Sequence, residues 1–117
     1  MMQNFQGYLL PVIFVGFFAW RFFKFRIVKK MIPRFLENGG IVVDVRSPGE
    51  FSQGSRPGSI NIPFNEMNAR SKELDSSKPI ILCCASGTRS GMAARILKRN
   101  GFKNVVNAGP WTNTLVG

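Results

Sequence analysis

Hydrophobic and polar positions are distributed unevenly along the chain, and the N-terminal part differs from all that follows. Residues 1–20 contain no charged side chain, and Tyr8–Trp20 is an almost unbroken apolar run. A helix needs about 20 apolar residues to cross a hydrocarbon core about 30 Å thick. The run approaches that length when apolar positions after it are added, with Arg21 and Lys24 snorkelling toward the headgroups. We therefore predict a membrane anchor over residues 1–30, formed by one transmembrane helix.

The charges beside the apolar run distinguish this anchor from two other kinds of segment. A cleaved secretory signal carries its basic region before the apolar run and a small-residue cleavage site after it. Here the basic residues follow the run: Arg21, Lys24, Arg26, Lys29 and Lys30. An interfacial helix needs a polar face, which the apolar run lacks. Because basic flanks lie on the cytoplasmic side, the sequence predicts a single-pass membrane protein whose domain is cytoplasmic.

After the basic flank the pattern changes to short apolar runs separated by Gly, Pro, Asn and Ser. The β-branched character of these runs is typical of buried parallel strands. Strands are expected over four segments: residues 41–45, 59–62, 80–83 and 104–106. Helices are expected before the first strand, over residues 33–38, and between later strands, over residues 64–70 and 89–100. The first of these helices should start at Pro33 and end at the Gly39-Gly40 pair. The alternation predicts an α/β domain over residues 31–117, with a mostly parallel sheet flanked by helices.

Composition excludes several classes of function. The net charge is +10, from 16 basic and 6 acidic residues. The sharpest basic cluster directly follows the apolar run, which is typical of a membrane flank. We therefore expect membrane lipid as a partner and do not expect nucleic acid. The chain has no histidine, which excludes histidine metal sites, Cys–His pairs and Ser–His–Asp triads. Its two cysteines, Cys83 and Cys84, are neighbours, a spacing that rarely permits a disulfide. They are too few for a zinc site, and we expect no metal and no cofactor.

One segment carries recognisable chemistry, because a buried strand ends in cysteine, a loop of small residues follows, and a helix begins. The segment comprises Cys84, Ala85, Ser86, Gly87, Thr88 and Arg89. In open α/β sheets, ligands bind beyond the carboxyl ends of the strands. Backbone N–H groups of such a loop, together with the positive end of the helix, favour a thiolate. We therefore predict that Cys84 is a nucleophile, and that Cys83 faces the opposite side of the strand. Arg89 would hold the loop or attract an anionic substrate, or else form a surface salt bridge.

Three pieces of sequence, taken in order and with their spacing, carry a family resemblance. They are VVDVRSPGEFSQGSRPGSINIP at 42–63, LCCASGTRSGMAARIL at 82–97 and GFKNVVNAGPW at 101–111. Over residues 31–111 the chain resembles the rhodanese homology domain family. The first piece resembles the family's D-x-R-x-x-x-E-F and G-x-x-P-G signature, and the second its C-x-x-G-x-R-S active loop. Two positions depart from the pattern: Ser55 stands where the family usually has His, and Ala108-Gly109 replaces a Gly-Gly pair.

The resemblance implies a fold, an activity and a set of site residues. The fold would be a small rhodanese-like domain, and the activity a transfer of sulfane sulfur through a persulfide on Cys84. The backbone from Ala85 to Arg89 would cradle the terminal sulfur. Asp44 and Arg46 would belong to a charged network near the site, although a satisfied buried ion pair explains these two residues equally well. The partners implied are small sulfur donors such as thiosulfate, and thiol or cyanide acceptors.

Two other hypotheses remain beside sulfur transfer. A cysteine phosphatase is the enzymatic alternative, because Cys83 to Arg89 spells C-x5-R. Counted from Cys84, however, the loop is one residue shorter, which suits a sulfur atom better than a phosphate with three oxygens. The remaining hypothesis is a membrane-tethered binding module without catalysis, against which the presence of Cys84 and Arg89 argues.

Overall fold

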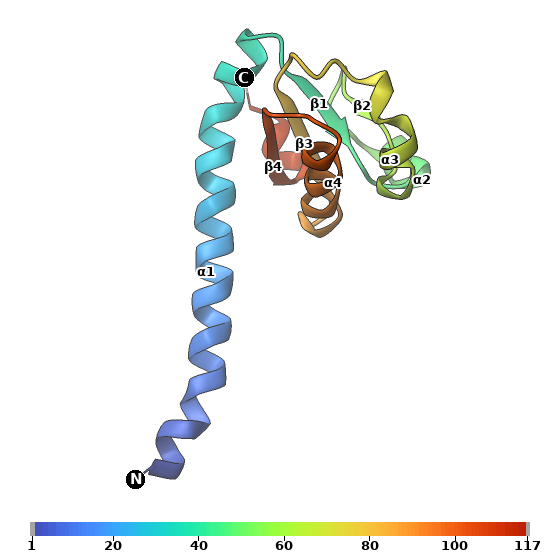
Figure 1. Cartoon of the computed structure of the whole chain (residues 1–117). Coiled ribbons are helices and arrows are strands. Elements are labelled where there is room, and N and C mark those ends of the chain that lie inside the picture. Colours follow the sequence, from blue (N-terminus) through green and yellow to red (C-terminus); the bar gives the residue numbers. More distant parts are fainter. Residues whose placement is uncertain (1, 117) are drawn as a thin grey trace.

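A computed structural model of the chain describes residues 2–116, with side chains from Gly7 onward (Figure 1). Met1 and Gly117, which belong to the predicted anchor and domain, lie outside the described residues. The helices are α1 (Met2–Glu37), α2 (Pro48–Gln53), α3 (Met67–Arg70) and α4 (Thr88–Arg99). The strands are β1 (Ile41–Asp44), β2 (Ile60–Asn61), β3 (Ile80–Cys84) and β4 (Val105–Pro110). Short 3-10 turns flank α3, and a further one, η3 (Trp111–Thr114), follows β4.

The four strands form one parallel sheet in the order β2-β1-β3-β4. The predicted fold class, a parallel α/β sheet with flanking helices, is therefore confirmed. Among the strands, the largest difference from the predicted bounds is at β4, which continues to Pro110 although only its first two residues are β-branched. The pairing of β3 with β4 is irregular between Leu82 and Cys84. Asn107 lies just before this irregularity, opposite Leu82 near the end of β3, and its side chain forms hydrogen bonds described below.

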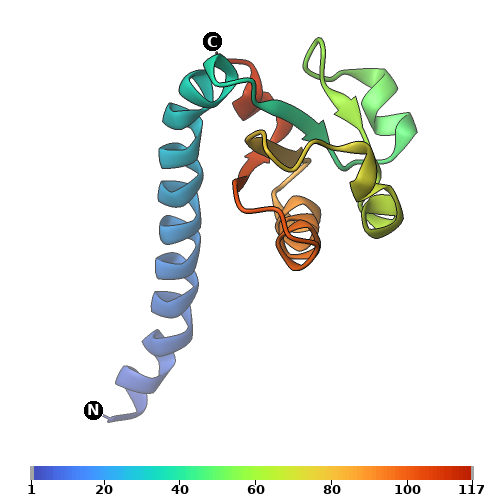
Figure 2. The same ribbon diagram turned by 45° about the horizontal axis from the view of Figure 1, so that its top comes forward.

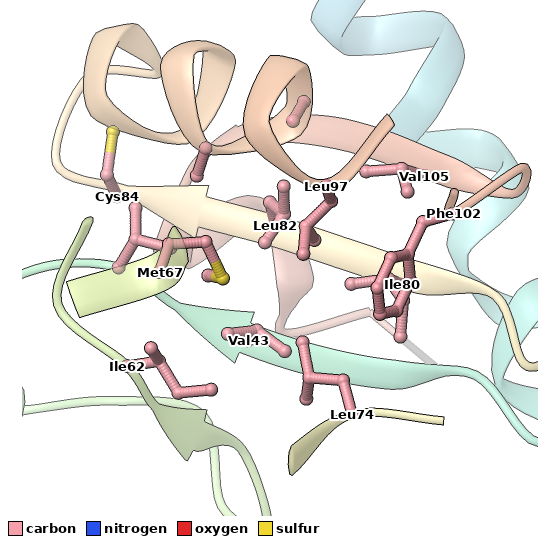
Figure 3. Close-up of a cluster of buried hydrophobic side chains, with 13 residues drawn as sticks. Val43, Ile62, Met67, Leu74, Ile80, Leu82, Cys84, Leu97, Phe102 and Val105 are labelled. Carbon is pink, nitrogen blue, oxygen red and sulfur yellow. The ribbon is translucent and has the colours of Figure 1, made fainter. Parts of the chain in front are cut away.

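Side chains alternate along the strands and form a separate core on each face of the sheet. On the face covered by α3 and α4, the larger core gathers around Val43, Leu82 and Leu97 (Figure 3). On the opposite face the smaller core contains Ile32 of α1 and Ile81 of β3, with Trp111 packed against them. The last two residues of β3 are divided between these cores, so Cys84 belongs to the larger core and Cys83 to the smaller one.

The first helix differs from the prediction, because no break separates an anchor from a short helix beginning at Pro33. Instead, α1 is continuous across Pro33 and the 30/31 boundary (Figure 2). Proline in a helix interior costs about 3 kcal/mol. Burial of the apolar side of the same turns against the sheet offsets that cost. Ile32 is fully buried there, and Val28 and Phe35 pack beside it. The second half of α1 is thus one layer of the domain.

The two ends of α1 have different surroundings. At the C-terminal end, Gly39 and Gly40 donate backbone hydrogen bonds to the carbonyls of Leu36 (3.1 Å) and Phe35 (2.8 Å), the Schellman pattern that terminates a helix. Gly39 takes the required positive φ of 82°. Toward the other end, every described residue from Gly7 to Trp20 is exposed. By length and composition, Gly7–Glu37 qualifies as a helix that could cross a membrane.

Candidate active site

Cys84 lies at the carboxyl end of β3, with its side chain directed toward the first turn of α4 (Figure 3). Its sulfur accepts a hydrogen bond from the backbone N–H of Gly87 (2.9 Å) and lies 3.3 Å from the Ser90 hydroxyl oxygen. Gly87 precedes α4 with φ of 100°, a conformation that non-glycine residues rarely adopt. The turn required for the N–H contact therefore depends on a glycine at this position.

Asn107 connects β4 to this loop and to Ser90 through its side-chain amide. Asn107 of β4 donates from its side-chain amide to the carbonyl of Gly87 (2.9 Å) and accepts from the Ser90 hydroxyl (2.6 Å). The single hydroxyl proton of Ser90 therefore has two acceptors within reach, the Asn107 oxygen and the Cys84 sulfur. Donation to sulfur is favoured when Cys84 is a thiolate, because charge-assisted hydrogen bonds are stronger.

The surroundings of Cys84 stabilise its ionised form. Burial is the largest single effect and raises the pKa of the thiol. Hydrogen bonds from the Ser90 side chain and backbone, and from the Gly87 and Ser86 backbone, together lower it by more. The net result is a Cys84 pKa below the ordinary value for cysteine. A thiolate is the nucleophilic form of cysteine, so the arrangement supports nucleophilic chemistry.

Cys83 has the opposite surroundings. It is 1% exposed within the smaller core, and burial, followed by the nearby Asp44 carboxylate, raises its pKa above the ordinary value. The C-x5-R spacing from Cys83 to Arg89 therefore begins at a thiol on the other face of the sheet from α4. This geometry argues against the phosphatase hypothesis.

Arg89 is already engaged by a carboxylate. Its two terminal nitrogens lie 2.7 Å and 3.0 Å from the two carboxylate oxygens of Glu50, a bidentate pair that links α4 to α2. Arg89, followed by the Ser47 backbone N–H, lowers the pKa of Glu50 to about 2. Glu50 and Ser47 also form a capping box at the start of α2. Arg89 thus fixes α2 against the active loop, and an anionic substrate would have to compete with Glu50 for it.

Asp44 and Arg46 form a buried ion pair whose closest N–O distance is 2.6 Å. Arg46 also donates to the carbonyl of Gly54 (2.7 Å) and lies over the Trp111 ring, on the face of the sheet that carries Cys83. The structure therefore brings this pair beside Cys83 and does not bring it to the sulfur of Cys84.

The predicted loop residues and three side chains without a predicted role come together at one place. Ala85, Ser86 and Thr88 are exposed, whereas Gly87 is buried. Ser90 stood in the C-x-x-G-x-R-S motif and Glu50 in the E-F motif, but neither motif indicates a contact. Asn107 carried no sequence signal, because only the pairing of β4 with β3, which sets it opposite Leu82, brings it here. Within residues 2–116, no three thiol or carboxylate side chains come together as metal ligands would.

The fold and site together define a class: a small parallel α/β protein with a thiol held in an N–H-lined loop at the carboxyl edge of the sheet. A family model described as Rhodanese-like domain matches residues 29–108. The chain therefore belongs to the rhodanese-like family, and the resemblance deduced from its motifs is confirmed.

Individual relatives agree with this membership. A putative sulfur carrier protein, YrkF, from Bacillus subtilis is 41% identical over 75 residues, covering 61% of this chain and 40% of that protein. A thiosulfate:glutathione sulfurtransferase from Saccharomyces cerevisiae is 34% identical over 77 residues, covering 55% of each chain. A solved structure, "rhodanese with anions from E. coli", is 31% identical with a TM-score of 0.61, covering 67% of this chain and 94% of that one. The chain thus spans about half the length, or less, of these curated relatives.

These similarities support a coarse functional statement. The homologues carry the names of sulfurtransferases or sulfur carriers, which supports a role of the rhodanese type in sulfur transfer.

Proposed function

We propose that the chain is a membrane-tethered sulfurtransferase that carries sulfane sulfur as a persulfide on Cys84. The observation that carries the proposal is the Cys84 sulfur, which receives the Gly87 N–H at 2.9 Å beside the N-terminus of α4. The names of the relatives support the same class of chemistry.

The proposed reaction consists of two displacements at sulfur, which replace one difficult transfer by two easier steps. The Cys84 thiolate attacks the outer sulfur of a donor such as thiosulfate and forms a new S–S bond. The donor's own S–S bond breaks, and sulfite leaves with the bonding electron pair. A thiolate or cyanide then attacks the outer sulfur of the persulfide. The Cys84 thiolate departs with the electron pair and is ready for another cycle.

The loop would stabilise both forms of the cysteine. The first N–H groups of a helix have no intrahelical acceptor, so the backbone from Ala85 to Arg89 offers donors to an outer sulfur as well as to Sγ. The Asp44–Arg46 pair would contribute by holding the end of β1 and not by touching substrate, because it faces the Cys83 side of the sheet.

Sulfur loading tests the proposal directly. The purified full-length chain is incubated with thiosulfate, and its intact mass is measured before and after addition of cyanide. We expect the mass to rise by one sulfur atom and to return to its starting value as thiocyanate appears. A chain that takes up no sulfur from thiosulfate or from glutathione persulfide would be a binding module instead.

The membrane part of the proposal rests on α1. Its charge-free N-terminal part precedes the basic flank that begins at Arg21, and basic flanks lie on the cytoplasmic side. The N-terminus would then be outside and the rhodanese-like domain inside. Protease added to sealed cells should leave the domain intact, whereas protease added to inverted vesicles should digest it. The opposite pattern would reverse the orientation.

A further inference from the structure

One face of α1 is directed at the domain well before the core begins. From Arg21 to Lys30 only Arg21, Phe25 and Val28 are shielded from solvent, and Ile32 continues the line as a fully buried residue. These spacings of four, three and four residues place the side chains on one side of a helix. The line runs from the sheet core at Ile32 to the loop that follows Cys84.

Phe25 fills a space that two glycines leave open. A Cβ atom on Gly87 would lie 2.5 Å from the Phe25 ring, and one on Gly109 would lie 3.0 Å from it. Both glycines have positive φ, 100° and 79°, and they approach each other closely behind the loop. The ring of Phe25 therefore covers the backbone of the residue whose N–H contacts the Cys84 sulfur.

Arg21 contacts the two residues on either side of Gly87. Its guanidinium donates to the carbonyl of Ser86 (3.0 Å) and to the hydroxyl of Thr88 (3.2 Å). The same guanidinium lies 5.3 Å from the centre of the Phe25 ring, within the range of a cation–π interaction. One turn of α1 thus touches three consecutive residues of the active loop.

We propose that Arg21 and Phe25 are positioning residues, through which the anchor helix completes the active site by holding the loop around Cys84. The inference rests on the proposed function, because the loop is the segment proposed to bind the outer sulfur of the persulfide. Glycine has the largest conformational freedom of any residue, and Gly87 supplies the closest donor to the sulfur. A ring packed on Gly87 and hydrogen bonds to both its neighbours limit the loop to the form that presents this donor.

The test measures the reactivity of Cys84 with iodoacetamide across pH, in the full-length chain in detergent micelles and on a Cys83→Ser background. Phe25→Ala and Arg21→Ala should move the half-maximal pH of alkylation upward, toward the ordinary thiol value of about 8.5. Alkylation at pH 7 should slow by roughly threefold to tenfold, since a rise of one pKa unit lowers the thiolate fraction about threefold when the pKa starts just below the pH and about tenfold when it lies well above the pH. Arg21→Lys, which keeps one donor, should restore part of the reactivity.

Matched controls come from the exposed face of the same helix. Phe23→Ala removes a ring that is 61% exposed, and Arg26→Ala removes an exposed cation, so both should keep the parent pH profile. If Phe25→Ala does not fold, Arg21→Ala still tests the proposal, because the Arg21 side chain is only partly shielded from solvent and its removal should leave the fold intact. Profiles of Phe25→Ala and Arg21→Ala that coincide with those of the controls would overturn the proposal.

Alkylation needs no sulfur substrate, so this test and the proposed function can fail separately. If the parent chain loads no sulfur but Phe25→Ala and Arg21→Ala still shift the pH profile, the proposed sulfurtransferase function is wrong and the positioning role stands. If the parent and all variants load sulfur at the same rate and have the same pH profile, the proposed function stands and the positioning role is wrong.

Discussion

At the scale of single residues, two neighbouring thiols differ in their surroundings because a strand directs them to opposite faces of the sheet. Cys84 receives N–H and O–H donors at the start of α4, and its pKa lies below the ordinary value even though burial opposes this. Cys83 lies in the smaller core beside a carboxylate, and burial and this charge raise its pKa. Nucleophilicity here therefore depends on local donors and not on the cysteine itself.

The two cysteines should respond differently to substitution. Cys84→Ser should abolish the gain of one sulfur after thiosulfate treatment, because the nucleophile is removed. Cys83→Ser should keep sulfur transfer, but it buries a hydroxyl without a designed partner and should lower the free energy of unfolding by about 1–3 kcal/mol. Mass spectrometry after sulfur loading and urea unfolding measure these two effects. Sulfur retained in Cys84→Ser and lost in Cys83→Ser would place the nucleophile at the wrong cysteine.

The pH dependence of Cys84 follows from the same donors. Because its folded pKa is lowered, alkylation should be half-maximal below about 8.5 and should decline as pH falls through the lowered value. Ser90→Ala removes the hydroxyl donor and should move the half-maximal pH upward. Ser59→Ala, whose hydroxyl bonds the carbonyl of Arg56 away from the loop, is the matched control. An unchanged profile in Ser90→Ala would show that the Ser90 proton goes to Asn107 in both protonation states.

At the scale of elements, α2 and α4 are joined through Glu50 and Arg89. The pair determines how much positive charge is available near the loop, because a bidentate carboxylate neutralises the guanidinium. A glutamine at Glu50 would keep the capping box of α2, in which Glu and Gln are interchangeable, and would remove only the charge.

Glu50→Gln should therefore change the affinity for anionic donors and not the chemistry of the thiol. We expect the KM for thiosulfate to fall about threefold or more, which corresponds to roughly 0.7 kcal/mol, with kcat little changed. Steady-state kinetics with thiosulfate and cyanide measure both constants. Glu73→Gln, which removes a carboxylate paired with Arg70 on the surface, is the matched control. A rise in KM would mean that the Arg89–Glu50 pair orders the site for its substrate.

The elements also show what the sequence could and could not predict. Periodicity and β-branched runs were sufficient for the parallel sheet, and Gly39-Gly40 correctly predicted the end of α1. Pro33 led to a wrong helix start, because its local preference is outweighed by the burial of Ile32 in contacts that are distant in sequence. Asn107 could not be found for the same reason, since only tertiary pairing of β3 with β4 brings it to the loop. Local signals were therefore sufficient to predict that the two cysteines face opposite sides of the sheet, but not which side chains surround Cys84.

At the scale of the whole molecule, α1 combines two roles along its length. Its first part projects from the domain with exposed apolar side chains, and its second part covers the sheet (Figure 2). Between them lie Arg21 and Phe25, which contact the active loop. A helix rises 1.5 Å per residue, so the charge-free residues 2–20 of α1 correspond to about 28 Å, close to the thickness of a hydrocarbon core. In a membrane, the active loop would therefore lie close to the headgroups.

Extraction and truncation test this division of α1. The full-length chain should stay with membranes in high salt and in carbonate, because its hold is apolar; release by high salt alone would mean an electrostatic, interfacial attachment. Without residues 2–20 the protein should be soluble and should keep the alkylation profile of Cys84, because Arg21 and Phe25 remain. Without residues 2–30 it should also be soluble, but its Cys84 should react several-fold more slowly at neutral pH. Full reactivity in both truncated proteins would show that α1 only tethers the domain, whereas reduced reactivity in both would mean that the loop depends on the segment before Arg21.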